Sequence, residues 1–247
     1  ALTPDNMLRF YSAPDIESNT VSPWFNTQWD EQVPEQPGQP LSGLALPGPN
    51  PFIASDLTLL EGQDERPSLL VETPSFTAWH MQDDRFNTPK VEWRVSLQSP
   101  TASYSAHEAV LTRLLASWLN DSLNESLYPA WLAGQSFSAY PHARGMTLSF
   151  SGWRDGQTPL IEQALEQLES AAITDSAFER VRYQLQREWR NAPQASLYGQ
   201  ASRTLGEALL TPQWSTAELL AASDRFDRSH LEDFRQRFLD NLYVDAM

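Results

Sequence analysis

The chain has 247 residues, 40% of them hydrophobic, with 9 Trp, 11 Phe and 7 Tyr. This composition excludes an intrinsically disordered protein, and the absence of any apolar run of about 18 residues argues against a membrane span. We therefore expect a soluble, globular protein. Its 17 basic and 32 acidic side chains give a formal net charge of -15, which disfavours nucleic acid as a partner. Because there is no Cys, disulfides and thiolate zinc sites are excluded.

The first part of the chain, residues 1–75, is predicted to be an extended arm or inter-domain linker. Nine prolines from Pro23 to Pro74 prevent helices or central strands from persisting there. The arm also carries large apolar side chains that need a surface to pack on. Among them we predict Trp24, Phe25 and Trp29 as a possible inter-domain contact. Both termini are interpreted as cuts in a longer chain, since no signal segment opens the sequence and a strand-like segment ends it.

The remainder, residues 76–247, is predicted to be one α/β domain. Apolar and polar residues alternate over 91–98, which indicates a half-buried strand. Over 106–127 the apolar residues recur at three- and four-residue spacings, which is typical of a long amphipathic helix. The inward stripe of this helix consists of Val110, Leu111, Leu114, Leu115, Trp118, Leu119 and Leu123.

A hairpin, several helices and a final strand complete the predicted domain. The segments 136–140 and 146–153 are expected to pair around Pro141 and Gly145. Pro159 opens the next predicted helix, whose inward residues are Leu160, Ile161, Ala164, Leu165 and Leu168. A capping box of Ser176 and Glu179 opens the following helix. Further helices are predicted over 196–210, 215–222 and 229–239, before a strand at 242–246. The fold class is therefore α+β, an antiparallel or mixed sheet covered on one face by helices.

The residues of this chain predict no complete catalytic, metal or cofactor site. The four histidines, His80, His107, His142 and His230, lie too far apart in sequence for the paired spacing of a zinc helix. His107 is followed by Glu108 but not by the second His that such a helix needs. No GxSxG elbow, Ser-x-x-Lys pair or phosphate loop is present.

Three further groups of residues have both a structural and a functional interpretation. Carboxylate clusters at 64–65, 83–84 and 162–169 are interpreted as acidic surface, with general acid or base catalysis as the alternative. The sequons at Asn120 and Asn124 fall on the predicted helix and are interpreted as coincidences. The last group follows helix and strand spacing, so core packing is the first interpretation and a peptide-contacting wall the second: Trp118, Tyr128, Trp131, Phe137 and Tyr140.

Three stretches, taken together and in order, resemble the insulinase or pitrilysin family of zinc peptidases. They are PWFNTQW at 23–29 with NPFIASDLTL at 50–59, FNTPKVEWRVSLQSP at 86–100, and LNDSLNESLYPAWLAGQSFSAYPHARGMTLSFSGW at 119–153. Within that family the chain resembles the middle, or third, domain, and the similarity extends over essentially the whole chain. The departures are Phe25-Asn26 in place of Tyr-Gly, Ala54 in place of Pro, and Pro129 at the helix end.

This resemblance implies a fold of the LuxS and processing-peptidase type, present in four related domains whose two halves enclose a chamber. The first domain of such an enzyme carries HxxEH and a distal Glu, so zinc is expected in the catalytic domain of the parent protein and not in this segment. The helix from 106 would take the place of the zinc helix, with an apolar stripe where ligands would be. No catalytic residue of the family is therefore carried over to this chain.

Two hypotheses of function follow. In the first, the segment is a non-catalytic, chamber-forming domain of a zinc metalloendopeptidase that degrades peptides or small unfolded proteins, with other domains of the same polypeptide and peptide substrate as its partners. By resemblance, the parent would lie in the periplasm or cytoplasm of a bacterium. In the second, the chain is a stand-alone peptide-binding or core-subunit module with the same fold and no protease activity. Within the first hypothesis, a third possibility is that the parent is a processing enzyme for a small peptide-derived cofactor precursor, which this sequence does not separate from a general peptide scavenger.

Overall fold

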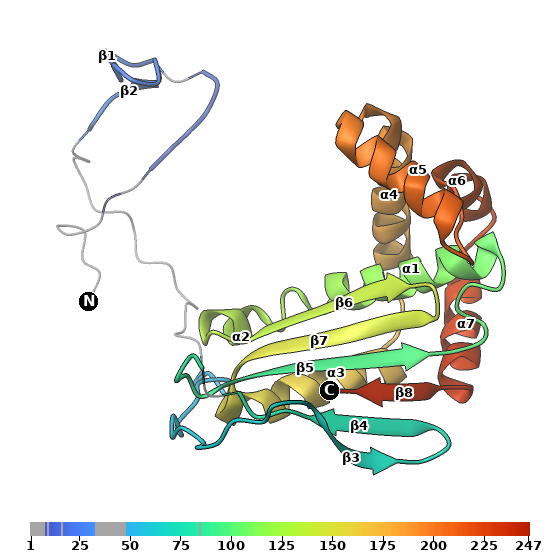
Figure 1. The fold of residues 1–247 in the computed structure, drawn as a ribbon. Helices are drawn as coiled ribbons and strands as arrows, with labels where there is room; N and C mark the ends of the chain where they lie inside the picture. The colour runs from blue at the N-terminus through green and yellow to red at the C-terminus, as the bar shows by residue number, and fades with distance from the viewer. Residues whose placement is uncertain (1–7, 9, 16, 33–47, 84) are drawn as a thin grey trace. The chain divides into compact units, whose positions relative to one another are not determined.

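The computed structural model describes residues 8, 10–15, 17–32, 48–83 and 85–247 (Figure 1). The chain divides into two compact units, residues 1–48 and residues 49–247. In the described part of the first unit, β1 (Thr20–Val21) and β2 (Gln28–Trp29) pair as a short antiparallel hairpin.

The second unit contains a mixed α+β fold, as the sequence predicted. Its strands are β3 (Ser68–Glu72), β4 (Phe76–His80), β5 (Lys90–Gln98), β6 (Ser136–His142), β7 (Gly145–Trp153) and β8 (Tyr243–Ala246). Its helices are α1 (Ala106–Leu123), α2 (Tyr128–Leu132), α3 (Gln157–Ser170), α4 (Asp175–Asn191), α5 (Leu197–Leu209), α6 (Thr216–Ser223) and α7 (Arg228–Asp240).

The six strands form one sheet in the order β3-β4-β8-β5-β7-β6. All neighbouring pairs are antiparallel except β4 and β8, which run parallel. Figure 1 shows α1 and α3 behind this sheet, on one of its faces, and no helix of the residues described within 49–247 covers the other, open face. The predicted antiparallel or mixed sheet, covered by helices on one face, is therefore confirmed.

The alternation of side chains along β5 and β7 separates these two faces. Val95 pairs with Leu148 and Leu97 with Met146, and these side chains point toward the helices, where Leu97, Leu148 and Met146 are buried. Arg94, one residue away on β5, points to the open face. A period of two residues thus places the core on one side of the sheet and polar groups on the other.

The long helix α1 forms the centre of the core. Its N-cap is Ser105, whose hydroxyl accepts a hydrogen bond from the Glu108 N–H. The predicted inward stripe is confirmed, because each of its seven residues is at most 4% exposed. The helix ends at Leu123, earlier than predicted, and Pro129 lies in the first turn of the separate helix α2. A proline is compatible with a first turn because it lacks only an N–H that has no helical partner there.

Two local predictions in the later helices are wrong. The N-cap of α4 is Thr174, which accepts from the Ala177 N–H, so Ser176 and Glu179 do not form a capping box. Glu179 instead accepts a hydrogen bond from Arg182 at 2.6 Å. In α3, Leu165 is 43% exposed and does not face inward as predicted.

The strand β3 lies within the stretch predicted as an arm. It is an edge strand, and Pro67 and Pro74 lie outside its two ends, so neither interrupts its pairing with β4. Phe52, from the same stretch, is buried in the core of the second unit. The division of the chain at residue 75 stays a prediction.

Two leucines of α3 provide a matched test of the core. Leu160 has no exposed surface, whereas Leu165 is 43% exposed. We expect Leu160→Ala to lower the free energy of unfolding by about 2–5 kcal/mol, because it removes buried methyl groups and leaves a cavity. Leu165→Ala should lower it by less than about 1 kcal/mol. Denaturant unfolding measures both values, and equal losses would contradict this account of α3.

Candidate interface and site residues

The three predicted contact residues lie in the hairpin of the first unit. Trp24 and Phe25 belong to the turn between β1 and β2 and are 88% and 83% exposed, and Trp29 lies in β2 and is 47% exposed. Asn26 closes the turn with a φ of 52°, a conformation that Asn tolerates better than most residues. The turn thus presents two large aromatic side chains at its tip, and their contact with another domain stays a prediction.

The surroundings of α1 do not suit a zinc ion. The seven residues of its buried stripe are apolar, and Zn²⁺ requires nitrogen, sulfur or carboxylate oxygen ligands. His107 stacks edge-on against Phe226 with ring centroids 5.7 Å apart, and the Glu108 carboxylate accepts a hydrogen bond from Ser105. Across the part of the chain that the structure describes, no three His, Asp or Glu side chains are gathered as metal ligands would be.

Ser96 on β5 and His142 on β6 form a pair that resembles part of a nucleophilic site, on the open face of the sheet. The Ser96 Oγ lies 3.2 Å from the His142 Nε2. The backbone N–H of Arg144 donates to the His142 Nδ1 at 3.2 Å, so in the neutral ring the proton resides on Nε2. Nε2 therefore donates to the serine.

That direction is opposite to what a serine nucleophile needs. In a catalytic triad the Nε2 of the histidine accepts the serine proton while a carboxylate holds Nδ1–H. Burial lowers the pKa of His142, and the nearby positive charge of Arg144 lowers it further, which favours the neutral ring. The pair is therefore a cross-strand hydrogen bond and not an activated nucleophile.

The predicted carboxylate clusters lie at the surface. Arg85 holds the pKa of Asp83 down to about 2, chiefly through a side-chain hydrogen bond, while Asp84 lies outside the described residues. Asp64 accepts a hydrogen bond from the Gln82 N–H at 2.7 Å, and the glutamates of α3 are exposed. The Asp83 carboxylate, kept ionised by Arg85, is a poor general acid or base at neutral pH.

The outer edge of the sheet at β6 is closed to further strands. Asn120, from α1, donates its amide to the Ala139 carbonyl at 2.7 Å and accepts from the Ala139 N–H at 2.8 Å. Two residues on, Pro141 has no N–H to offer. Because alternate residues of an edge strand direct their backbone groups outward, these two positions block pairing with an extended peptide over that part of β6.

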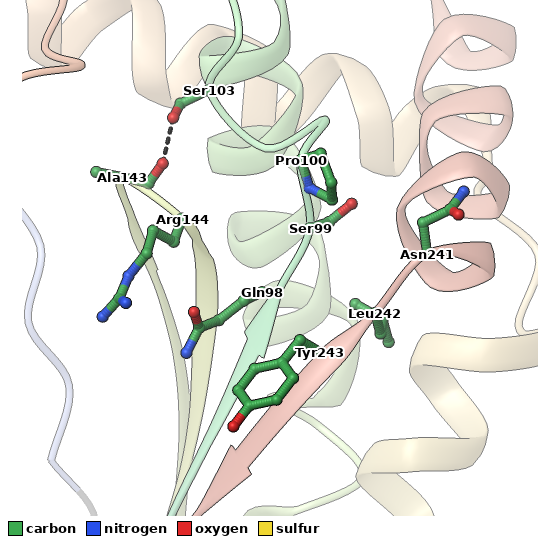
Figure 2. Close-up of a pocket in the computed structure, with 9 residues that line it drawn as sticks. All are labelled: Gln98, Ser99, Pro100, Ser103, Ala143, Arg144, Asn241, Leu242 and Tyr243. Carbon is green, nitrogen blue, oxygen red and sulfur yellow. Dashed lines mark hydrogen bonds between the residues drawn. The ribbon is translucent and has the colours of Figure 1, made fainter. Parts of the chain in front are cut away.

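A recess of about 580 Å³ lies where β5, β8 and the β6–β7 turn end (Figure 2). It is lined by Gln98, Ser99, Pro100, Ser103, Ala143, Arg144, Asn241, Leu242 and Tyr243. In Figure 2 the side chains of Gln98, Arg144 and Tyr243 extend to the same side. The lining offers amides, hydroxyls and one positive charge but contains neither His nor carboxylate, so it can hydrogen-bond a polar group and supplies no general base.

The five predicted aromatic residues differ in their exposure, and some of them lie at a second recess of about 440 Å³. Tyr128 and Trp131 of α2 stack at its edge with ring centroids 5.8 Å apart, and they are 56% and 65% exposed. Tyr140 is also exposed, whereas Trp118 is buried in the core and Phe137 packs against it. Core packing is thus confirmed for Trp118 and Phe137 and is wrong for the other three residues.

Comparison with known proteins places the chain among peptidase domains. A family model described as the middle or third domain of peptidase_M16 matches residues 1–222. The chain is 28% identical to insulin-degrading enzyme of Homo sapiens, over all of this chain and 25% of the human protein. It is 26% identical to insulin-degrading enzyme of Drosophila melanogaster, over 96% of this chain and 23% of the fly protein.

A solved structure has the same fold. A crystal structure of pitrilysin superposes with a TM-score of 0.76 over 83% of this chain and 22% of that chain, at 21% sequence identity. This chain therefore spans about a quarter of the length of the curated relatives it matches. Both relatives named here are animal proteins, so a bacterial source stays a prediction without support from them.

The closure of the β6 edge can be tested at Asn120. We expect Asn120→Asp to lower the free energy of unfolding by about 1–3 kcal/mol, because the carboxylate cannot donate to the Ala139 carbonyl. The matched control is Asn124→Asp in the other sequon, where the side chain is exposed and the loss should stay below about 1 kcal/mol. Thermal unfolding monitored by circular dichroism compares the two, and equal losses would contradict a specific role for Asn120.

Proposed function

This chain belongs to the family of middle or third domains of M16 peptidases, and we propose that it is a non-catalytic, chamber-forming domain of a zinc metalloendopeptidase. The observation that carries the proposal is the inward stripe of α1, where every residue is at most 4% exposed and none can ligate a metal. By resemblance this helix takes the place of the zinc helix of a catalytic domain, and its inward stripe is used for packing.

Two further features support a structural role. The pairing of Ser96 with His142 has the wrong proton arrangement for nucleophilic catalysis. Asn120 and Pro141 prevent an extended peptide from adding to that part of the β6 edge, which removes one common way of holding a polypeptide next to a site. The domain therefore supplies a surface and not a reaction centre.

The open face of the sheet suits the wall of a chamber. Its hydroxyl groups pair across strands, as in the contacts of Ser136 with Ser151 at 2.7 Å and of Thr77 with Tyr243 at 2.6 Å. Arg94 donates to Ser149 on the same face. Because these polar groups are paired with one another, the face is wettable, which suits a surface along which an unfolded peptide passes.

In this proposal the parent protein degrades peptides or small unfolded proteins, and its zinc is held by another domain. The partners of this chain are then other domains of the same polypeptide and the peptide substrate. Among the described residues no helix is long and apolar enough to cross a membrane. The alternative, a stand-alone module that binds peptides without cutting them, differs in requiring no zinc domain in the parent.

The proposal is tested by metal analysis and a cleavage assay. The purified 247-residue chain should hold no stoichiometric zinc and should not cut an unstructured fluorogenic peptide. The full-length protein that contains it should bind zinc and cut the peptide. One tightly bound zinc ion per isolated chain, or hydrolysis that a chelator abolishes, would refute a non-catalytic role. A full-length protein that binds the peptide without cutting it would favour the stand-alone module.

We also propose that Trp24, Phe25 and Trp29 contact another domain of the parent. If so, these side chains are uncovered in the isolated chain and promote its association with other copies. Replacing all three with Ser should shift the chain toward monomer in sedimentation velocity. The control is Tyr104→Ser, which removes an equally exposed aromatic side chain from the second unit, and an identical shift in both variants would argue against a specific contact.

A further inference from the structure

One helix of the second unit turns its apolar side outward. In α5 the apolar residues recur at three- and four-residue spacings and so fall on one side of the helix. This side, the α5 apolar face, consists of Leu197, Tyr198, Ala201, Leu205, Ala208 and Leu209. None of the residues of α5 is buried, and Leu197, Leu205 and Leu209 are 84%, 59% and 72% exposed.

The opposite, polar side of α5 is fixed to its own unit. The Gln200 amide donates to the carbonyl oxygens of Pro193 and Ala195 at 3.0 and 2.8 Å. The Arg203 guanidinium donates to the carbonyl oxygen of Ala192 at 3.0 Å. These three hydrogen bonds set the rotation of the helix about its axis, so the α5 apolar face cannot turn toward the core without breaking them.

An amphipathic helix whose apolar side is exposed lacks the burial that stabilises most helices of folded proteins. A segment of 13 residues is only marginally helical in water, and most helices depend on burial of their apolar side. In Figure 1 α5 lies near the end of α4 that is farther from the sheet, and its three leucines stay largely exposed among the described residues. An apolar stripe with anchors one turn apart is also the pattern by which amphipathic helices dock on proteins.

From this geometry we propose that the α5 apolar face packs against another domain of the same polypeptide. The proposal rests on the proposed function, since it needs the chain to be one domain of a longer peptidase. The aligned segment is only 23% to 25% of the fly and human relatives, so about three quarters of each lies outside it. An attached domain has a high effective concentration, which favours it as the occupant over a freely diffusing second copy or peptide.

The chemistry of the face defines the partner surface. Leu205 lies at the middle of the stripe, and Gln200 and Arg203 are engaged on the other side, so the partner must offer an apolar groove without an unpaired charge opposite Leu205. Tyr198 brings a hydroxyl to one end of the stripe, where the partner can supply a hydrogen-bonding group.

Hydrogen–deuterium exchange of the α5 amides tests the contact. We expect these amides to exchange at least tenfold more slowly in the full-length protein than in the 247-residue chain. Leu205→Gln should remove most of that protection in the full-length protein and leave exchange in the 247-residue chain unchanged, because its side chain is already 59% exposed there. The matched control is Thr204→Gln, an exposed position on the same helix outside the apolar face.

Three outcomes would overturn the proposal. They are equal exchange of α5 in the two proteins, protection that appears only when a peptide substrate is added, and a dimer of the 247-residue chain that Leu205→Gln dissociates. The proposed function fails by different readouts, namely zinc content and peptide cleavage. Protection of α5 in a full-length protein without zinc would leave the domain contact standing and remove only the peptidase role.

Discussion

The burial of one side of α1 is the constraint on which the second unit depends. This helix lies against β6 and β7 and also contacts α3, α4, α6 and α7, so its apolar stripe joins the sheet to most of the helical layer. Trp118 and Leu115 are at most 1% exposed at the centre of that stripe. A metal ligand placed within this stripe would have to replace one of these residues, and the fold would lose contacts that assemble it. The stripe that assembles the fold is therefore the part of α1 that offers no metal ligand.

The same helix also controls the edge of the sheet. Asn120 lies beside the buried stripe, and its amide satisfies the backbone of Ala139 in both directions. An edge strand with free N–H and C=O groups is a template for pairing with other chains, and native proteins block such edges. The sequon at Asn120 is thus explained by a structural role, because its side chain is used inside the domain.

Periodicity predicted the elements of this fold well, whereas the environment of individual residues required the structure. The alternation in β5 and the stripe of α1 follow from local sequence, since each element must bury one side. The sequence predicted Ser176 as the N-cap of α4, whereas the N-cap is Thr174. A Thr and a Ser two residues apart can both serve as N-caps, and the sequence alone does not select one of them. The exposure of Tyr128 and Trp131 could not be predicted from the sequence either, because a residue spacing that fits a core also fits an outer surface.

The helix α5 shows why a sequence pattern does not determine which way a side chain faces. Its apolar residues have the spacing of a core helix, yet hydrogen bonds from Gln200 and Arg203 to backbone carbonyls of residues 192–195 hold the polar side against the segment that precedes the helix. In an isolated domain that arrangement leaves apolar surface in water, at a free energy cost of roughly 25 cal/mol for each Å². This chain has a net charge of -15, and charged residues such as those it carries would suit an outer side of α5 that faces water. Leucines on the outer side of α5 are therefore best explained by a surface that covers them.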